Sequence, residues 1–128
     1  MDENSADRPT FVLLVEDEVV LRMDAAQFLE DERFNVIEST NGQHASAVIE
    51  RHPNIHVLFT DVNLPGSPNG VELAYIARRR WPSMVILIVS GKATLKDNEM
   101  PAGSRFLPKP YHPKVAVRHI NELLGQAG

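Results

Sequence analysis

The sequence contains no cysteine, and this absence excludes disulfides, a thiol nucleophile and a thiolate metal site. A chain without cysteine also fits the reducing cytoplasm. No apolar run approaches the roughly 20 residues that a membrane-spanning helix needs, so no membrane association is predicted. Positive charge is scarce as well, because 13 Lys and Arg face 17 Asp and Glu for a net charge of −4. That balance gives the chain no general attraction to nucleic acid or anionic lipid.

The length and composition of the chain are typical of one globular domain. The 128 residues are 43% hydrophobic, which is enough for a single core and too much for a disordered chain. The first nine residues are acidic and polar and lack the apolar centre of a signal peptide, so residues 1–9 are expected to form a flexible tail. The domain is expected over residues 10–125, followed by a short tail at 126–128.

Apolar runs of strand length alternate with segments of helical periodicity along the chain. This alternation predicts an α/β fold, a doubly wound parallel sheet with helices on both faces. The polar segment at 92–103 contains Pro101 and Gly103, and it leaves room for only a short or irregular fourth helix. The apolar runs predict strands at residues 10–16, 34–38, 55–61, 85–89 and 105–107.

The expected helices have recognisable starts and inward faces. Asn41 and Asn69 are N-cap candidates, and Pro113 suits the first position of the last helix. The first helix is expected to run to about residue 32 and to bury one apolar stripe. That stripe consists of Leu21, Ala25, Phe28 and Leu29.

Polar residues follow four of the five predicted strands, each at the point where the strand ends. An unpaired carboxylate is costly inside a sheet, so Asp61 is expected at the sheet's carboxyl edge. In a doubly wound sheet the neighbouring strand ends form one cleft, and four separate strand ends are predicted to meet there. The residues are Glu16 and Asp17 after the first strand, Asp61 at the end of the third, Ser90 at the fourth and Lys109 after the fifth.

Such a cleft has the groups that phosphoryl chemistry requires. Three carboxylates together need a cation, and an all-oxygen ligand set without nearby Cys or His suits Mg²⁺. Lys109 adds a fixed positive charge and Ser90 adds a hydroxyl donor. The cations neutralise the phosphoryl oxygens while a carboxylate attacks in line, and the product is an acyl phosphate. The residues therefore predict Mg²⁺-dependent phosphorylation of Asp61.

These motifs resemble bacterial response-regulator receiver domains over about residues 10–125. The matching residues are Glu16-Asp17, Asp61 with Leu64-Pro65 and Gly70, Ser90-Gly91, and Lys109-Pro110. The resemblance implies a flavodoxin-like sheet with strand order 2-1-3-4-5. The stretches LFTDVNLPGSPNG and FLPKPY are most similar to small receivers of alphaproteobacteria. A stand-alone receiver is expected, with no output domain after Leu124.

The resemblance also implies a role for each residue of the cleft. Asp61 would accept a phosphoryl group from a phosphohistidine on a sensor histidine kinase or a phosphotransfer protein. Ser90 and Lys109 would bind the phosphoryl oxygens, and the Lys109–Pro110 peptide bond would be cis. The implied Mg²⁺ ligands are the side chains of Asp17 and Asp61, the backbone carbonyl of Asn63, and Glu16 through a metal-bound water.

A conformational switch is implied as well. Ser90 would move toward the phosphoryl group, and Phe106, an aromatic residue of the fifth strand, would rotate into the vacated space. The receiver would catalyse only its own phosphotransfer and autodephosphorylation, so it is not expected to be an enzyme that acts on other molecules. As a monomer or weak homodimer, it would act through an unknown downstream protein target.

Several alternatives remain open at this point. The chain could relay phosphate or act as a phosphate sink, or it could be a pseudo-receiver that binds partners without phosphorylation, although Asp61 and Lys109 are both present. A phosphatase with an aspartyl nucleophile would need an acid two residues later, where this chain has Asn63. A flavodoxin-like cofactor site would need glycines or hydroxyls after the first strand, where this chain has Glu16 and Asp17.

Overall fold

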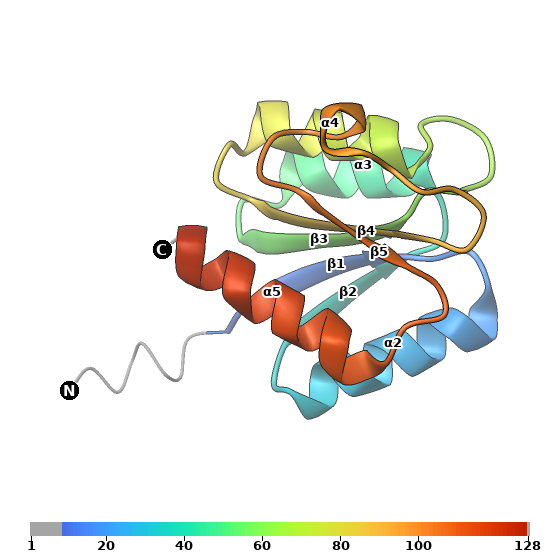
Figure 1. The fold of residues 1–128 in the computed structure, drawn as a ribbon. Helices are drawn as coiled ribbons and strands as arrows, with labels where there is room; N and C mark the ends of the chain where they lie inside the picture. The colour runs from blue at the N-terminus through green and yellow to red at the C-terminus, as the bar shows by residue number, and fades with distance from the viewer. Residues whose placement is uncertain (1–8, 128) are drawn as a thin grey trace.

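The structure is a computed structural model that describes residues 9–127. Five parallel strands form one sheet in the order β2-β1-β3-β4-β5, so the predicted strand order is confirmed (Figure 1). Each strand lies close to its predicted range, and the expected tail at 1–9 falls, apart from Pro9, outside the described residues. The strands are β1 (Phe11–Val15), β2 (Asn35–Ser39), β3 (Ile55–Asp61), β4 (Val85–Ser90) and β5 (Arg105–Pro108).

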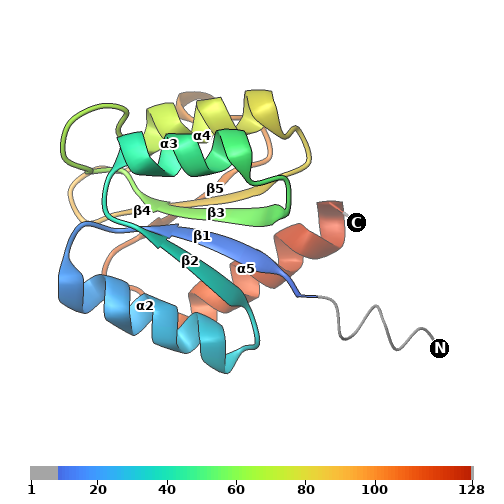
Figure 2. The same cartoon turned by 180° about the vertical axis from the view of Figure 1, so that it is seen from behind.

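Two helices cover each face of the sheet, as the alternation predicts. Asn41 and Asn69 cap α3 and α4, because their side-chain oxygens accept the backbone N–H groups of His44 and Glu72. None of the helices within residues 9–127 is long and apolar enough to cross a membrane. One face carries α2 (Val19–Asp31) and α5 (Pro113–Ala127), and the other carries α3 (Gly42–Arg51) and α4 (Gly70–Arg80) (Figures 1 and 2).

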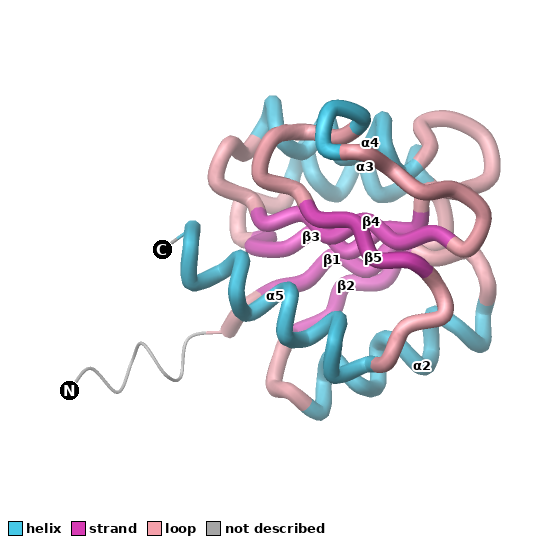
Figure 3. Tube along the Cα trace, in the orientation of Figure 1, coloured by secondary structure: helices cyan, strands magenta, loops and turns pink. Residues whose placement is uncertain are grey.

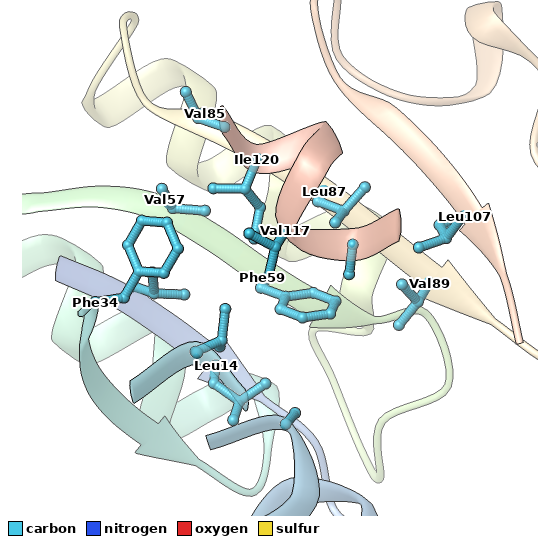
Figure 4. Packing of buried hydrophobic residues seen from close by; sticks show 14 of the residues in the cluster. Leu14, Phe34, Val57, Phe59, Val85, Leu87, Val89, Leu107, Val117 and Ile120 are labelled. Atoms are coloured by element: carbon cyan, nitrogen blue, oxygen red, sulfur yellow. The ribbon is translucent and has the colours of Figure 1, made fainter. Parts of the chain in front are cut away.

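The central strands β1, β3 and β4 are buried on both faces, which explains why they consist of continuous apolar runs. Val12 and Leu14 of β1 belong to the hydrophobic cluster under α2 and α5. Leu13 and Val15 point to the opposite side and belong to the cluster under α3 and α4. Figure 4 shows the first cluster, in which the Phe59 ring of β3 lies among side chains from β1, β4 and α5.

The connection between β4 and β5 contains no α-helix. Its helical part is η1, a 3-10 turn at Asp97–Glu99, and Figure 3 shows the rest of the connection as loop. The expectation of a short or irregular fourth helix is therefore confirmed. Met100 closes the connection and packs into the cluster under α3 and α4. The polar residues before it supply no continuous apolar stripe that a longer helix could bury.

Two expectations about the helices are wrong. The tail expected at 126–128 begins too early, because α5 continues past Gly125 to Ala127. Leu21 of the predicted α2 stripe is 40% exposed, whereas the other three residues of that stripe face the core. The first turn of α2 lies beyond the core, and there Arg22 takes the inward position and donates to the Glu16 carbonyl oxygen at 3.2 Å.

Candidate functional site

The carboxyl ends of β1, β3, β4 and β5 meet at one edge of the sheet, as predicted. The strand register places Asp61 beside Val89 of β4, and it places Ser90 beside Pro108 of β5. The residues that end or follow these strands consequently lie at the same level of the edge. The structure brings together Glu16, Asp17, Asp61, Ser90 and Lys109.

Asp61 lies at the end of β3 with only 6% of its surface exposed. Its Oδ2 accepts a hydrogen bond from Lys109 Nζ at 2.7 Å, and its Oδ1 accepts the Asn63 backbone N–H at 3.1 Å. The Thr60 hydroxyl donates to the Asp61 carbonyl oxygen at 2.9 Å. A buried carboxylate is tolerated here because an opposite charge and hydrogen bonds compensate for its lost hydration.

Lys109 joins two carboxylates that come from different strands. Its Nζ lies 2.7 Å from Asp61 Oδ2 and 2.8 Å from Glu16 Oε1. Burial lowers the pKa of Lys109, but hydrogen bonds and charges from Asp61 and Glu16 together raise it by more, so the net shift is upward. Lys109 therefore keeps its positive charge at neutral pH, as a phosphate-binding cation must.

Glu16 is as deeply buried as Asp61, with 5% of its surface exposed. Burial raises the pKa of Glu16, although its hydrogen bonds with Lys109 and with the Glu18 backbone oppose that rise. The Glu18 N–H donates to Glu16 Oε2 at 3.2 Å, so both carboxylate oxygens have protein donors. The direct contact with Lys109 was not predicted from the sequence, because it depends on how two long side chains extend across the edge.

An oxygen-only metal site fits the same edge of the sheet. One carboxylate oxygen from each of Glu16, Asp17 and Asp61 lies within 4.8 Å of the other two. Asp17 is exposed at the rim, whereas the other two residues are buried. These three carboxylates outnumber the single ammonium group of Lys109, so a divalent cation would reduce their mutual repulsion. The donor set is of the kind that Mg²⁺ prefers, and the residues therefore fit this ion.

Ser90 ends β4 and is 1% exposed. Its Oγ accepts the backbone N–H groups of Lys92 and Ala93, both at 3.1 Å. The side-chain Nδ2 of Asn63 donates to the same oxygen at 3.2 Å. The sequence predicted a role for the backbone carbonyl of Asn63, but it gave no indication that its side chain contacts Ser90.

The loop between Asp61 and α4 is held by close backbone contacts at both ends. A Cβ on Gly70 would lie 1.9 Å from the Asp61 carbonyl oxygen, so only glycine fits there. Pro68 lies so close to α3 that a Cβ on Gly42 would be 1.9 Å from the Pro68 carbonyl oxygen. This contact, and the cis Ser67–Pro68 peptide bond, were not predicted. The loop between Asp61 and α4 therefore rests on the start of α3.

Aromatic residues surround the end of β5. Phe106 is half-buried and packs against the cluster under α3 and α4. The Lys109–Pro110 peptide bond is cis, as the resemblance implied. Tyr111 follows it and packs with Phe28 and Phe59 at ring-centroid distances of 6.2 and 6.0 Å, a cluster that the sequence did not predict. Burial raises the pKa of the Tyr111 hydroxyl, with the nearby carboxylates adding to the effect, so it stays neutral.

Comparison with known proteins shows the family. The sequence model for the response regulator receiver domain matches residues 12–121. The chain belongs to the response regulator receiver family. This receiver is 29% identical to the response regulator receiver protein CpdR of Brucella abortus, over 88% of this chain and 95% of CpdR. It is similar in structure to a receiver protein of Sinorhizobium medicae, with a TM-score of 0.90 and 27% identity over 94% of this chain and 98% of that one.

Other relatives are longer proteins that this receiver matches only in part. It spans 20% of a cyclic di-GMP phosphodiesterase of Thermotoga maritima, with 38% identity over 79 residues. It spans 26% of the hydrogenase transcriptional regulatory protein HoxA of Cupriavidus necator, with 34% identity. Family membership makes the chain a phosphoacceptor receiver of two-component signalling. Receivers of this family interact with histidine kinases and downstream effectors.

Proposed function

We propose that Asp61 is the residue that accepts the phosphoryl group, and that the donor is a phosphohistidine on a sensor histidine kinase or phosphotransfer protein. The observation that carries this proposal is the setting of Asp61. Its buried carboxylate ends a central strand, bonds to Lys109 at 2.7 Å, and lies in a cluster of three carboxylates. The Asp61 carboxylate can act as a nucleophile because the Lys109 ammonium group lies next to it and can bind the incoming phosphoryl oxygens.

The transfer step conserves atoms and charge in a simple way. A carboxylate oxygen of Asp61 forms a bond to phosphorus while the phosphorus–nitrogen bond to the donor imidazole breaks. The donor ring carries a proton on its other nitrogen, so when the bonding electron pair returns to the first nitrogen the histidine leaves in its neutral form. Lys109 Nζ and the Ser90 hydroxyl donate hydrogen bonds to phosphoryl oxygens, which stabilises the charge spread over them in the transition state.

Mg²⁺ is the proposed cofactor of this site. It would be held by the side chains of Asp17 and Asp61 and by the backbone carbonyl of Asn63. Glu16 is proposed to contact the ion through a metal-bound water. When bound, the ion supplies positive charge that neutralises phosphoryl oxygens. Lys109, which donates to Asp61 Oδ2, supplies the second positive charge.

The receiver is proposed to act as a signalling protein rather than as an enzyme on other molecules. It would be a bacterial protein of the cytoplasm, active as a monomer or weak homodimer through a downstream protein target. Loss of phosphate would occur by hydrolysis of the acyl phosphate within the same site. Its net charge of −4 supports protein partners over nucleic acid.

Phosphorylation by a small acyl phosphate tests this function. With Mg²⁺ present, the intact protein is expected to gain the mass of one phosphoryl group. Asp61→Asn should abolish the gain, because an amide is not a nucleophile for phosphorus, and chelation of Mg²⁺ should abolish it in the unchanged protein. Asp24→Asn removes an exposed carboxylate of α2 and should leave the gain intact. A gain that survives in Asp61→Asn would overturn the assignment.

Replacing Phe106 with alanine is expected to weaken the response to phosphorylation without preventing phosphorylation. The ring packs against the cluster that includes Met100, at the end of the β4–β5 connection, and its loss should also cost about 2 kcal/mol of stability. Mass measurement should show normal phosphoryl gain, while binding of the downstream protein becomes less dependent on phosphorylation. Phe11→Ala, which changes a half-buried ring at the opposite edge, is the matched control. Unchanged partner binding in both states would remove Phe106 from the switch.

A further inference from the structure

Three N–H donors converge on the oxygen of Ser90. Two are the backbone N–H groups of Lys92 and Ala93, each at 3.1 Å, and the third is Nδ2 of Asn63 at 3.2 Å. A hydroxyl oxygen has two lone pairs, so these three donors share both of them and leave none free. Within residues 9–127 Ser90 makes no hydrogen bond to Asp61. The resting position of Ser90 is therefore set by its donors and not by the phosphoryl acceptor.

Asn63 occupies an unusual position between the two functional residues. Its backbone N–H donates to Asp61 Oδ1 at 3.1 Å, while its side chain donates to Ser90 Oγ. The residue is exposed, so its side chain is not held in place by burial. One residue of the loop after β3 thus contacts both the proposed acceptor and the proposed switch.

We propose that the Asn63 carboxamide is a positioning group that restrains Ser90, and the backbone of Lys92 and Ala93 with it, in the unphosphorylated arrangement. The proposal rests on the function proposed above for Asp61 and Ser90. When Ser90 turns to donate to a phosphoryl group on Asp61, it gives up its acceptor role toward these donors. The hydrogen bond from Asn63 opposes that rotation, so this side chain determines the population of the turned state of Ser90 in the unphosphorylated protein.

The hydrogen bonds of the Ser90 oxygen matter for the β4–β5 connection because few other contacts hold its first residues. After Ser90 the chain is exposed from Gly91 to Thr94, and its first helical element is the short turn η1 at Asp97–Glu99. The start of the connection is consequently held by the Ser90 oxygen rather than by a helix of its own. Release of the Lys92 and Ala93 amides therefore reports the position of Ser90.

The test compares backbone amide resonances of Lys92 and Ala93 in the full chain. In Asn63→Ala the backbone N–H and carbonyl stay, and only the side-chain donor is lost. Because one hydrogen bond of ordinary strength corresponds to about a fivefold change in an equilibrium constant, the turned state should become about fivefold more populated. In unphosphorylated Asn63→Ala, both amide resonances should shift along the line that joins their positions in the spectra of the unphosphorylated and the phosphorylated unchanged protein. Their hydrogen exchange should also accelerate by about fivefold.

Asn98→Ala is the matched control, because it removes an exposed carboxamide from the same connection, within η1. It should leave the Lys92 and Ala93 amides at their resting positions. Suppose that the unchanged protein responds to acyl phosphate and Mg²⁺. If the Lys92 and Ala93 resonances of Asn63→Ala then coincide with those of the unchanged protein, and their hydrogen exchange is unaltered, the proposed restraint is overturned. An unchanged protein that gains no phosphoryl mass would instead overturn the proposed function, and the restraint with it.

Discussion

Replacing Lys109 with methionine is expected to slow phosphorylation of Asp61 by about 100-fold or more, the effect of removing one preorganised charge that stabilises a transition state. Methionine keeps most of the side chain's apolar length but removes the ammonium group that lies 2.7 Å from Asp61 Oδ2. The rate of phosphoryl mass gain from a small acyl phosphate measures the effect directly. The comparison with Lys114→Met, which changes an exposed lysine of α5, separates the loss of this ammonium from the loss of a surface charge.

The same substitution should reduce stability in a pH-dependent way. Without Lys109, two nearly buried carboxylates face each other without a counter-charge, and breaking such a pair costs about 3 kcal/mol at neutral pH. The pKa of Glu16, already raised by burial, should rise further. In the unfolded chain Glu16 ionises at its usual, lower pKa, so the deficit should be small below that pKa, grow as the pH rises toward the raised folded-state pKa, and level off above it. Denaturant unfolding at several pH values measures it, and a deficit that is constant with pH would contradict this account.

Gly70→Ala is expected to destabilise the receiver by more than about 3 kcal/mol, which is large for a single methyl group. The added Cβ would lie 1.9 Å from the Asp61 carbonyl oxygen and 2.7 Å from the Val62 Cα. Both neighbours are backbone atoms, so the end of β3 or the start of α4 must shift to make room. For a domain of this size the melting temperature should fall by about 10 °C or more.

The shift should also displace the Asp61 carboxylate and lower the rate of phosphorylation. Gly125→Ala is the control, because a Cβ there would meet nothing within 4 Å and alanine is the better residue in a helix. It should stabilise the protein by up to about 1 kcal/mol. A Gly70→Ala protein with unchanged melting temperature would show that the contact between α4 and β3 is looser than the structure describes.

The fold was predictable because the central strands β1, β3 and β4 are covered on both faces. Runs such as residues 85–89 are apolar at every position, and only a parallel sheet between two helix layers buries both sides of so many strands. The meeting of Glu16, Asp61 and Lys109 at one edge then follows from the common direction of the strands. Helix starts at Asn41 and Asn69 were predictable because the capping side chain acts within its own turn.

What the sequence did not predict depends on contacts between distant side chains or loops. The apolar residues of α2 recur with helical periodicity, but this periodicity does not show which turns of the helix extend beyond the core. Leu21 was therefore predicted to face the core, although it is exposed. The hydrogen bond from the Asn63 side chain to Ser90 joins the loop after β3 to the end of β4, and no local pattern encodes the path of that loop. Predicting the approach of Pro68 to Gly42 likewise requires knowing how the loop between Asp61 and α4 folds back on α3.

Locating the phosphoryl group within the chain is the most direct test of the central claim that Asp61 is the acceptor. Borohydride reduces an aspartyl phosphate to homoserine, and peptide mass spectrometry then identifies the residue that has changed. The structure predicts conversion of Asp61 alone, in the peptide that contains the end of β3, and only in protein treated with acyl phosphate and Mg²⁺. Conversion at Asp17 or Glu16 instead, or a peptide from β3 that remains unchanged in fully phosphorylated protein, would contradict it.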